Sequence, residues 1–122
     1  FLARERPDFV EINYSVTERE AERRFLPMLA ERGIGVLISR PFMNGAYFER
    51  LANVPLPDWV AEFECTTWAQ FSLKYIFGNP PVTCVLTETT RAENMAENAL
   101  AAYGAVPNRR ARGRMRAFID AI

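Results

Sequence analysis

Three short apolar stretches recur along the chain, and each is too short for a helix of ordinary length. Residues 9–14 alternate between apolar and polar side chains, which is typical of a strand with one covered face. Residues 34–39 are nearly all apolar, as in a parallel strand covered on both faces. Residues 82–86 form a β-rich apolar run directly after the breaker pair Pro80-Pro81. The pattern therefore predicts three strands.

The segment between the first two strands has the pattern of a capped helix. Thr17 with Glu20 forms a capping box, and apolar residues follow at helical spacing. Pro27 lies inside this segment, so we expect a kink, or a break and a restart with Pro27 in the first turn. Gly33 is a suitable helix C-cap, which places the helix end directly before the second strand.

The connection from the second to the third strand is long. Its first part, residues 40–58, is irregular, with one short helix predicted near residues 46–51. A connection of that length in a compact domain is usually functional. A helical turn is predicted at residues 59–63, followed by a helix that Thr66 caps and that stops at Gly78. The predicted inner face of that helix consists of Ala69, Leu73, Ile76 and Phe77.

A polar turn follows the third strand. It leads into a second capping box, Thr90 with Glu93, so a helix should begin at about Arg91 and close at Gly104. The free N–H groups and the dipole at such a helix N-terminus favour an anion. An ordinary βα unit with a threonine cap explains the same residues equally directly.

A last helix is predicted from about residue 108 to residue 122. Its apolar side carries Met115, Phe118 and Ile119. Its other side carries five arginines, namely Arg109, Arg110, Arg112, Arg114 and Arg116. The net charge of the whole chain is zero, so we interpret this run as a solvated, salt-bridged helix face and expect no nucleic-acid partner.

Alternation of strands and helices predicts an α/β fold with parallel strands and right-handed crossovers. Three strands make a thin sheet with two bare edges, so the pattern resembles a slice of a larger α/β sheet or barrel. The 122 residues fit one domain, and the start at Phe1 suggests a processed product or a piece of a longer chain.

Composition narrows the chemistry further. The chain contains no histidine, which excludes a Ser-His-Asp triad, a Cys-His pair and histidine-ligated metal sites within it. Cys65 and Cys84 lie in apolar settings and are predicted to be reduced core thiols. No membrane-length apolar run and no signal-peptide pattern is present. We therefore expect a cytoplasmic protein without a membrane partner or a bound metal.

Four segments together resemble the C-terminal part of the aldo-keto reductases. They are Glu11-Ile-Asn-Tyr14, residues 33–42 (Gly-Ile-Gly-Val-Leu-Ile-Ser-Arg-Pro-Phe), residues 68–74 (Trp-Ala-Gln-Phe-Ser-Leu-Lys) and residues 82–98. The resemblance implies a partial TIM barrel, in which residues 1–122 supply three parallel strands alternating with helices plus a C-terminal helix. These would be the sixth to eighth βα units. In such barrels the active site lies at the carboxyl ends of the strands, here Tyr14-Ser15, residues 39–41 and residues 86–90.

The resemblance implies a role in cofactor binding. The family transfers hydride between a nicotinamide dinucleotide and a carbonyl or alcohol, and its catalytic residues lie in the earlier half of the barrel. No catalytic residue is therefore expected in this chain. The positions that match cofactor contacts of the family are Glu11, Ser39, Arg40, Pro41, Glu88, Thr89, Asn94, Glu97 and Asn98.

These positions have characteristic roles in the family. Glu11 replaces a glutamine that holds the nicotinamide carboxamide, and Ser39 replaces a tyrosine that stacks on the nicotinamide ring. Arg40-Pro41 opens the loop beside the pyrophosphate, and Glu88-Thr89 matches a Lys-Ser or Gly-Thr pair after the last strand. Asn94 matches an arginine or histidine position, and Glu97-Asn98 matches the Glu-Asn that touches adenine.

Two of these departures bear on cofactor choice. Glu88 and Asn94 stand where the family often has cations beside a 2′-phosphate. A carboxylate about 4 Å from a phosphate charge costs about 4 kcal/mol per unit charge at an effective dielectric near 20. We therefore expect NAD(H) to be favoured over NADP(H), if either is bound.

Three functions remain open at this stage. The first is the cofactor-binding part of a reductase that acts on a small carbonyl substrate together with its missing half. The second is a non-catalytic barrel remnant or interaction domain that self-associates through exposed strand edges. The third, an independent nucleotide-binding module, ranks last because Ser15-Val-Thr17 after the first strand contains no glycine.

Overall fold

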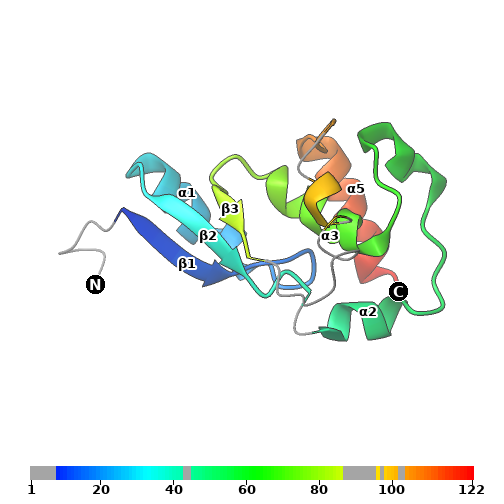
Figure 1. Ribbon diagram of the computed structural model, residues 1–122. Coiled ribbons are helices and arrows are strands. Elements are labelled where there is room, and N and C mark those ends of the chain that lie inside the picture. The colour runs from blue at the N-terminus through cyan, green and yellow to red at the C-terminus, as the bar shows by residue number, and fades with distance from the viewer. Residues whose placement is uncertain (1–7, 43–44, 87–95, 97, 102–103) are drawn as a thin grey trace.

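A three-stranded sheet and a group of helices beyond its strand ends make up the chain (Figure 1). The computed structural model describes residues 8–42, 45–86, 96, 98–101 and 104–122. The order of elements is β1 (Phe9–Asn13), the 3-10 helix η1 (Glu20–Glu22), α1 (Phe25–Glu31), β2 (Gly35–Ser39), α2 (Ala46–Leu51), the 3-10 helix η3 (Asp58–Phe63), α3 (Trp68–Phe77), β3 (Cys84–Val85) and α5 (Arg109–Asp120).

The three strands pair in the predicted manner. They form a parallel sheet in the order β1-β2-β3, with Glu11 opposite Leu37 and Leu37 opposite Cys84. β3 is shorter than the predicted strand over residues 82–86. Just before β3, the Thr83 hydroxyl accepts a hydrogen bond from Val36 N–H at 3.0 Å, and Thr83 N–H donates to Val36 O at 2.9 Å.

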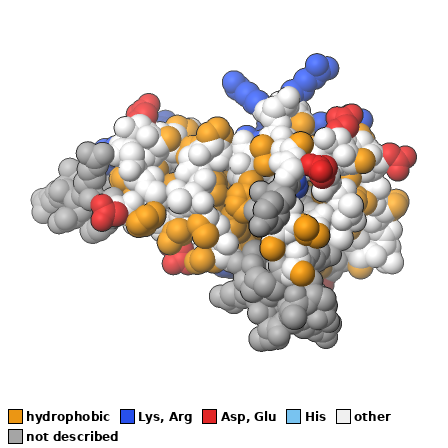
Figure 2. All heavy atoms as spheres, turned by 45° about the horizontal axis from the view of Figure 1, so that its top comes forward, with side chains coloured by type: hydrophobic (Ala, Val, Ile, Leu, Met, Phe, Trp, Pro, Cys, Tyr) orange, Lys and Arg blue, Asp and Glu red, His pale blue; other side chains and the backbone are white. Residues whose placement is uncertain are grey.

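The two faces of the sheet differ sharply. Val36 and Ile38 are fully buried against the helices. The opposite face carries Glu11 and Cys84, both exposed, and Phe9, whose side chain is 58% exposed. Within the described part of the chain the sheet is therefore covered on one side, and apolar side chains remain visible over the sheet half of the molecule (Figure 2).

The predicted capping box at Thr17 and Glu20 is wrong. Ser15 uses its hydroxyl locally, accepting from the Thr17 and Glu18 N–H groups at 3.2 and 2.9 Å. This Ser/Thr turn replaces a helix start, and a short 3-10 helix without a side-chain cap follows at η1. The helix proper begins only at Phe25, which puts Pro27 in its first turn, one of the two predicted outcomes.

The end of α1 follows the prediction. Gly33 has φ +67°, in the left-handed region that glycine adopts without strain. Its N–H donates to Ala30 O at 3.1 Å, and Ile34 N–H donates to Leu29 O at 3.0 Å. These two hydrogen bonds constitute a Schellman motif. The motif reverses the chain into β2.

The helix α3 occupies the centre of the helical part. Thr67 caps it, accepting from Gln70 N–H at 3.1 Å, so the predicted cap at Thr66 is off by one residue. The helix ends at Gly78 as predicted. Its burial is wider than the predicted inner face, because every residue from 69 to 76 is buried while Phe77 is half-buried.

Neighbouring elements enclose α3 on several sides. Tyr47 of α2 donates a hydrogen bond to Trp68 O at 2.7 Å. Trp59 of η3 contacts Phe71 edge-on, with ring centroids 6.4 Å apart. Buried polar groups of α3 are satisfied by the backbone of adjacent segments, since Lys74 Nζ donates to Ala105 O at 2.8 Å.

The arginine run on α5 is the predicted solvated, salt-bridged face at Arg109, Arg110 and Arg114, which are exposed, but not at Arg112. Arg112 is buried, and it donates to Glu22 Oε1 at 2.7 Å, to the Tyr14 hydroxyl at 2.9 Å and, through Nε, to Tyr75 O at 3.1 Å. Tyr14 and Tyr75 also donate their hydroxyl protons to Glu22. We call this group of four side chains the Glu22 cluster. It joins η1, the end of β1, α3 and α5.

The other predictions from the sequence are confirmed in part. Cys65 is buried and Cys84 is exposed, so the prediction of two core thiols is wrong for Cys84; both are free. The short helix α2 lies where it was predicted. The predicted helix start at Arg91 lies outside the described residues, and residues 98–100 are helical. Among the described residues, no helix has the length and apolar character needed to cross a bilayer.

Candidate functional site

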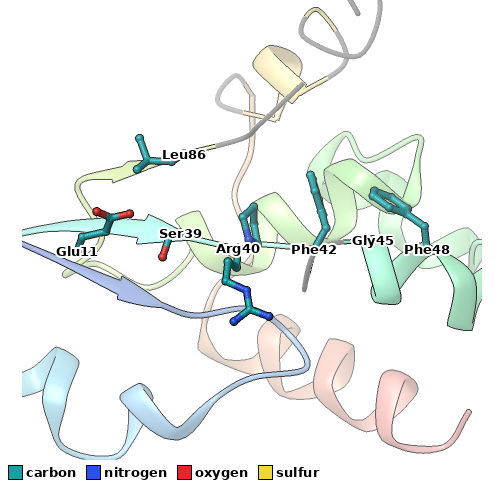
Figure 3. A pocket seen from close by; sticks show the side chains of 8 residues that line it. Glu11, Ser39, Arg40, Phe42, Gly45, Phe48 and Leu86 are labelled. Carbon is teal, nitrogen blue, oxygen red and sulfur yellow. The ribbon is translucent and has the colours of Figure 1, made fainter. Parts of the chain in front are cut away.

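A pocket of about 270 Å³ opens where the strands end (Figure 3). It draws on β1, on the end of β2 and the turn after it, on α2 and on the end of β3. The residues that line it are Glu11, Ser39, Arg40, Pro41, Phe42, Gly45, Phe48 and Leu86. The carboxyl ends of parallel strands are the place where a barrel of this kind holds its ligand.

Glu11 and Ser39 reach the pocket from neighbouring strands. Alternation along β1 puts Glu11 on the uncovered face of the sheet, where its carboxylate is exposed. Ser39 ends β2, and its Oγ lies 2.7 Å from Asn13 Oδ1 and 3.2 Å from Ile12 O. The serine proton is therefore engaged with β1, so Ser39 can only accept a hydrogen bond from a ligand, and the Glu11 carboxylate is a second, charged acceptor.

Arg40 has an unusual backbone conformation. Its φ is +54°, in the left-handed region that non-glycine residues rarely adopt. Residues held in this way cluster at ligand sites, where the surrounding structure maintains the strain. The side chain is exposed, and it makes no ion pair or hydrogen bond with any described residue. A cation in this state at the pocket rim can bind an anionic ligand.

The far side of the pocket is aromatic. Phe42 follows Pro41 and packs on Phe48 of α2, with ring centroids 4.7 Å apart. Figure 3 shows Glu11, Ser39, Arg40, Phe42 and Phe48 in this order from left to right, with Leu86 above Glu11 and Ser39 and with the Arg40 side chain turned downward. The pocket therefore has a polar end at the sheet and an apolar end at α2.

The donor set can be tested against a nicotinamide dinucleotide. The exposed carboxylate of Glu11 accepts hydrogen bonds, so it suits the amide N–H₂ of a carboxamide. The guanidinium of Arg40 suits a phosphate. At about 270 Å³ the pocket lies near the lower limit for ligand sites, so it suits one nucleotide of the pair rather than both. With that restriction the residues fit the group.

The structure brings four of the nine sequence-predicted residues together, namely Glu11, Ser39, Arg40 and Pro41. Asn98 is half-buried in the helical residues 98–100 and does not line this pocket. The other four positions, Glu88, Thr89, Asn94 and Glu97, lie outside the described residues. Tyr14 and Ser15, predicted at the site edge of the first strand, are fully buried instead, with Tyr14 in the Glu22 cluster.

Three lining residues were not predicted from the sequence at the site: Phe42, Gly45 and Phe48. Leu86 lies at the end of the third strand, where the site was predicted, and Phe42 directly follows Pro41, so its proximity was foreseeable. The proximity of Gly45 and Phe48 was not foreseeable, because α2 is brought to the strand ends only by the tertiary fold of the connection after β2. No group of three or more cysteine, aspartate or glutamate side chains suited to a metal lies together among the described residues.

Comparison with known proteins identifies the fold. No model of a known protein family matches the sequence, and no curated protein matches it. Two solved structures of aldo-keto reductase AKR11C1 from Bacillus halodurans, a holo form and an apo form, are similar to the chain. Both are 19% identical in sequence, with TM-scores of 0.71 and 0.72.

The extent of the match defines what is shared. The similarity covers 95% of this chain and 44% of the reductase, so the chain spans less than half of that protein's length. The fold expected from the sequence is confirmed: the chain is an α/β structure with three parallel strands that matches part of the barrel of that reductase. The coverage agrees with the C-terminal portion to which the sequence was assigned.

Proposed function

We propose that residues 1–122 are one domain, the cofactor-binding C-terminal portion of an aldo-keto reductase-like oxidoreductase that acts on carbonyl or alcohol substrates. The observation that carries this proposal is the pocket at the strand ends, where Glu11, Ser39, Arg40 and Pro41 meet. The resemblance gives the same four residues a role in cofactor contact. Strand pairing brings them together, and Glu11 and Arg40 present exposed charges there that packing does not require.

In this proposal, different residues of the chain bind different parts of the cofactor. Glu11 accepts a hydrogen bond from the carboxamide, and Arg40 neutralises phosphate charge beside Pro41. When bound, a nicotinamide dinucleotide supplies or accepts hydride. The catalytic residues and part of the small carbonyl substrate's pocket belong to the missing half of the barrel. By the resemblance, Glu97 and Asn98 contact the adenine end, and Asn98 does not line the pocket described above.

The preferred cofactor in this proposal is NAD(H). The resemblance places Glu88, Thr89 and Asn94 near the 2′-phosphate position. None of these three residues is a cation. Arg91 is the one nearby cation in the sequence that competes with this assignment. Glu88→Lys should shift preference toward NADP(H), and Arg91→Ala should leave preference unchanged. Tighter NADP(H) binding by the wild type, lost in Arg91→Ala, would overturn the cofactor assignment.

The binding role itself is tested at Arg40. NADH and NADPH are titrated against wild type, Arg40→Met and Arg110→Met, with nucleotide fluorescence as the readout. Arg110 is an exposed arginine on α5 that does not line the pocket, so it is a matched control. Loss of a charge-assisted hydrogen bond should weaken binding of both nucleotides about tenfold in Arg40→Met, and Arg110→Met should bind as wild type does. Equal affinity in all three proteins would refute the proposal.

A second candidate function is a non-catalytic interaction domain that self-associates. The observation that favours it is the uncovered sheet face with Phe9 58% and Leu86 41% exposed, together with an outer edge of β1 that no described strand pairs. Phe9→Asp should then convert a concentration-dependent dimer into a monomer in sedimentation equilibrium. A wild-type chain that is monomeric at all accessible concentrations excludes this candidate.

We also propose that the protein acts in the cytoplasm, without membrane or nucleic-acid partners. Two free cysteines, one of them exposed, agree with a reducing compartment. A fusion to a fluorescent protein, imaged in cells, tests the location.

A further inference from the structure

The apolar end of the pocket is built from adjacent residues of α2 with opposite environments. Tyr47 is 1% exposed, and its hydroxyl is anchored to Trp68 O at 2.7 Å. Phe48, the next residue, consequently points to another side of the helix and is 39% exposed at the pocket. Packing within the described residues therefore covers the Tyr47 ring and leaves the Phe48 ring partly exposed at the pocket.

Phe42 and Phe48 together make an extended apolar wall. Their rings are tilted by 45° at a centroid distance of 4.7 Å, and Tyr47 supports both, at 6.1 Å from Phe42 and 5.3 Å from Phe48. Gly45 lies between them in sequence and also lines the pocket. A Cβ at Gly45 would meet no described atom within 4 Å, so the described residues leave open space beside Gly45.

The wall lies next to a charge. Arg40 and Phe42 are two residues apart and line the same pocket, and Arg40 has no partner among the described residues. Ser39 carries no ring, and its hydroxyl is engaged with β1. Among the described residues that line the pocket, Phe42 and Phe48 are the ones with aromatic rings.

We infer that Phe42 and Phe48 form a ring-binding wall, so that the pocket takes a ligand with a flat ring beside an anionic group. The ring stacks against the wall, and the anion pairs with Arg40. This inference deepens the proposed function and rests on it only for the identity of the ligand. The same chemistry is present in a nucleotide and in an aromatic carbonyl substrate that carries a carboxylate.

The test compares matched ligands with and without a ring on the 122-residue chain. One pair is nicotinamide mononucleotide and ribose 5-phosphate, and the other is 4-carboxybenzaldehyde and 4-oxobutanoate. Affinities are measured by NMR titration for wild type, Phe48→Leu, Phe48→Tyr and Phe9→Leu. Phe9→Leu is the control, because Phe9 is an exposed phenylalanine of β1 that does not line the pocket.

The readout is the ratio of affinities within a pair, which a general loss of stability does not change. In wild type the ringed member of at least one pair should bind about threefold to tenfold more tightly. The ratio should fall to about one in Phe48→Leu and persist in Phe48→Tyr and Phe9→Leu. The pair that shows the ratio identifies the source of the ring. A ratio near one for both pairs in wild type, or a ratio that Phe48→Leu leaves unchanged, overturns the inference.

Failure of this inference is distinguishable from failure of the proposed function. If Arg40→Met weakens NADH binding and Phe48→Leu does not, the ring-binding wall is contradicted and the cofactor role is supported. A ring-dependent ratio for the aldehyde pair without any NADH binding keeps the wall and removes the cofactor role.

Discussion

Removal of Arg112 should destabilise the fold far more than removal of any solvated arginine on the same helix. The guanidinium donates three hydrogen bonds, to Glu22 Oε1 at 2.7 Å, to the Tyr14 hydroxyl at 2.9 Å and to Tyr75 O at 3.1 Å. The side chains of Arg112 and Glu22 are only 10% and 19% exposed. In Arg112→Met the aliphatic part of the side chain is kept, while the Glu22 carboxylate loses its principal counter-charge inside the protein.

The size of the effect follows from burial. Breaking a buried ion pair by removing one partner typically costs about 3–5 kcal/mol, because the other charge stays buried. Arg116 offsets part of this cost, since its Nη1 lies 3.9 Å from Glu22 Oε2. We therefore expect a loss of about 3 kcal/mol for Arg112→Met. Arg110→Met, on the exposed side of α5, should change stability by less than about 0.5 kcal/mol.

Urea denaturation, followed by tryptophan fluorescence, measures the difference. At a slope near 2 kcal/mol per M, a loss of about 3 kcal/mol lowers the midpoint by about 1.5 M. The double variant Glu22→Gln/Arg112→Met should be less destabilised than the two single changes added together, because each single change leaves one group unpaired. Arg112→Met with a midpoint equal to that of Arg110→Met would refute the assignment of the Glu22 cluster as the link between sheet and helices.

Three further predictions concern pH, thiol chemistry and activity. Burial raises the pKa of Cys65 from 9.0 to about 11 and also raises the pKa values of Tyr14 and Tyr75. At high pH the folded chain therefore keeps protons that the unfolded chain releases. The free energy of unfolding should not depend on these groups below about pH 8, and it should fall as pH rises from about 9 toward 11. Urea titrations at each pH measure this change. Iodoacetamide at pH 8 should modify the exposed Cys84 within minutes and Cys65 only in denaturant, as intact mass spectrometry will record; equal modification of both in the folded chain contradicts the burial of Cys65. The purified chain should reduce no aldehyde with NADH or NADPH, and turnover that survives repurification and is lost in Glu11→Ala contradicts this.

The sequence was most informative where a local signal is strong. Gly33 and Gly78 were identified as helix ends, because a helix terminus needs a residue that tolerates the local backbone or interrupts it. The first strand was predicted from the alternation of apolar and polar residues, and the other two from apolar runs next to glycine or proline. Helix starts were less predictable, since several hydroxyl residues compete for one turn. Ser15 rather than Thr17 accepts the backbone hydrogen bonds of its turn, and Thr67 rather than Thr66 caps α3.

Long-range burial was beyond the sequence pattern. Arg112 stands in a run of arginines whose spacing predicts a solvated face, and only the meeting of α5 with Glu22 and Tyr75 makes it a buried partner. The same limit applies to the pocket. Its polar end could be predicted, because the carboxyl ends of adjacent parallel strands meet at one edge. Its aromatic end, at Phe48, depends on the path of the connection after β2.

The most direct test of the central claim maps NADH binding on the chain itself. The ¹⁵N-labelled 122-residue chain is titrated with NADH, and amide shifts are followed in two-dimensional NMR spectra. The account predicts saturable shifts concentrated at the pocket, at residues 11, 39, 40, 45 and 48, with the amides of α1 unchanged as an internal control. The absence of saturable shifts, or shifts confined to surfaces away from the strand ends, would contradict it.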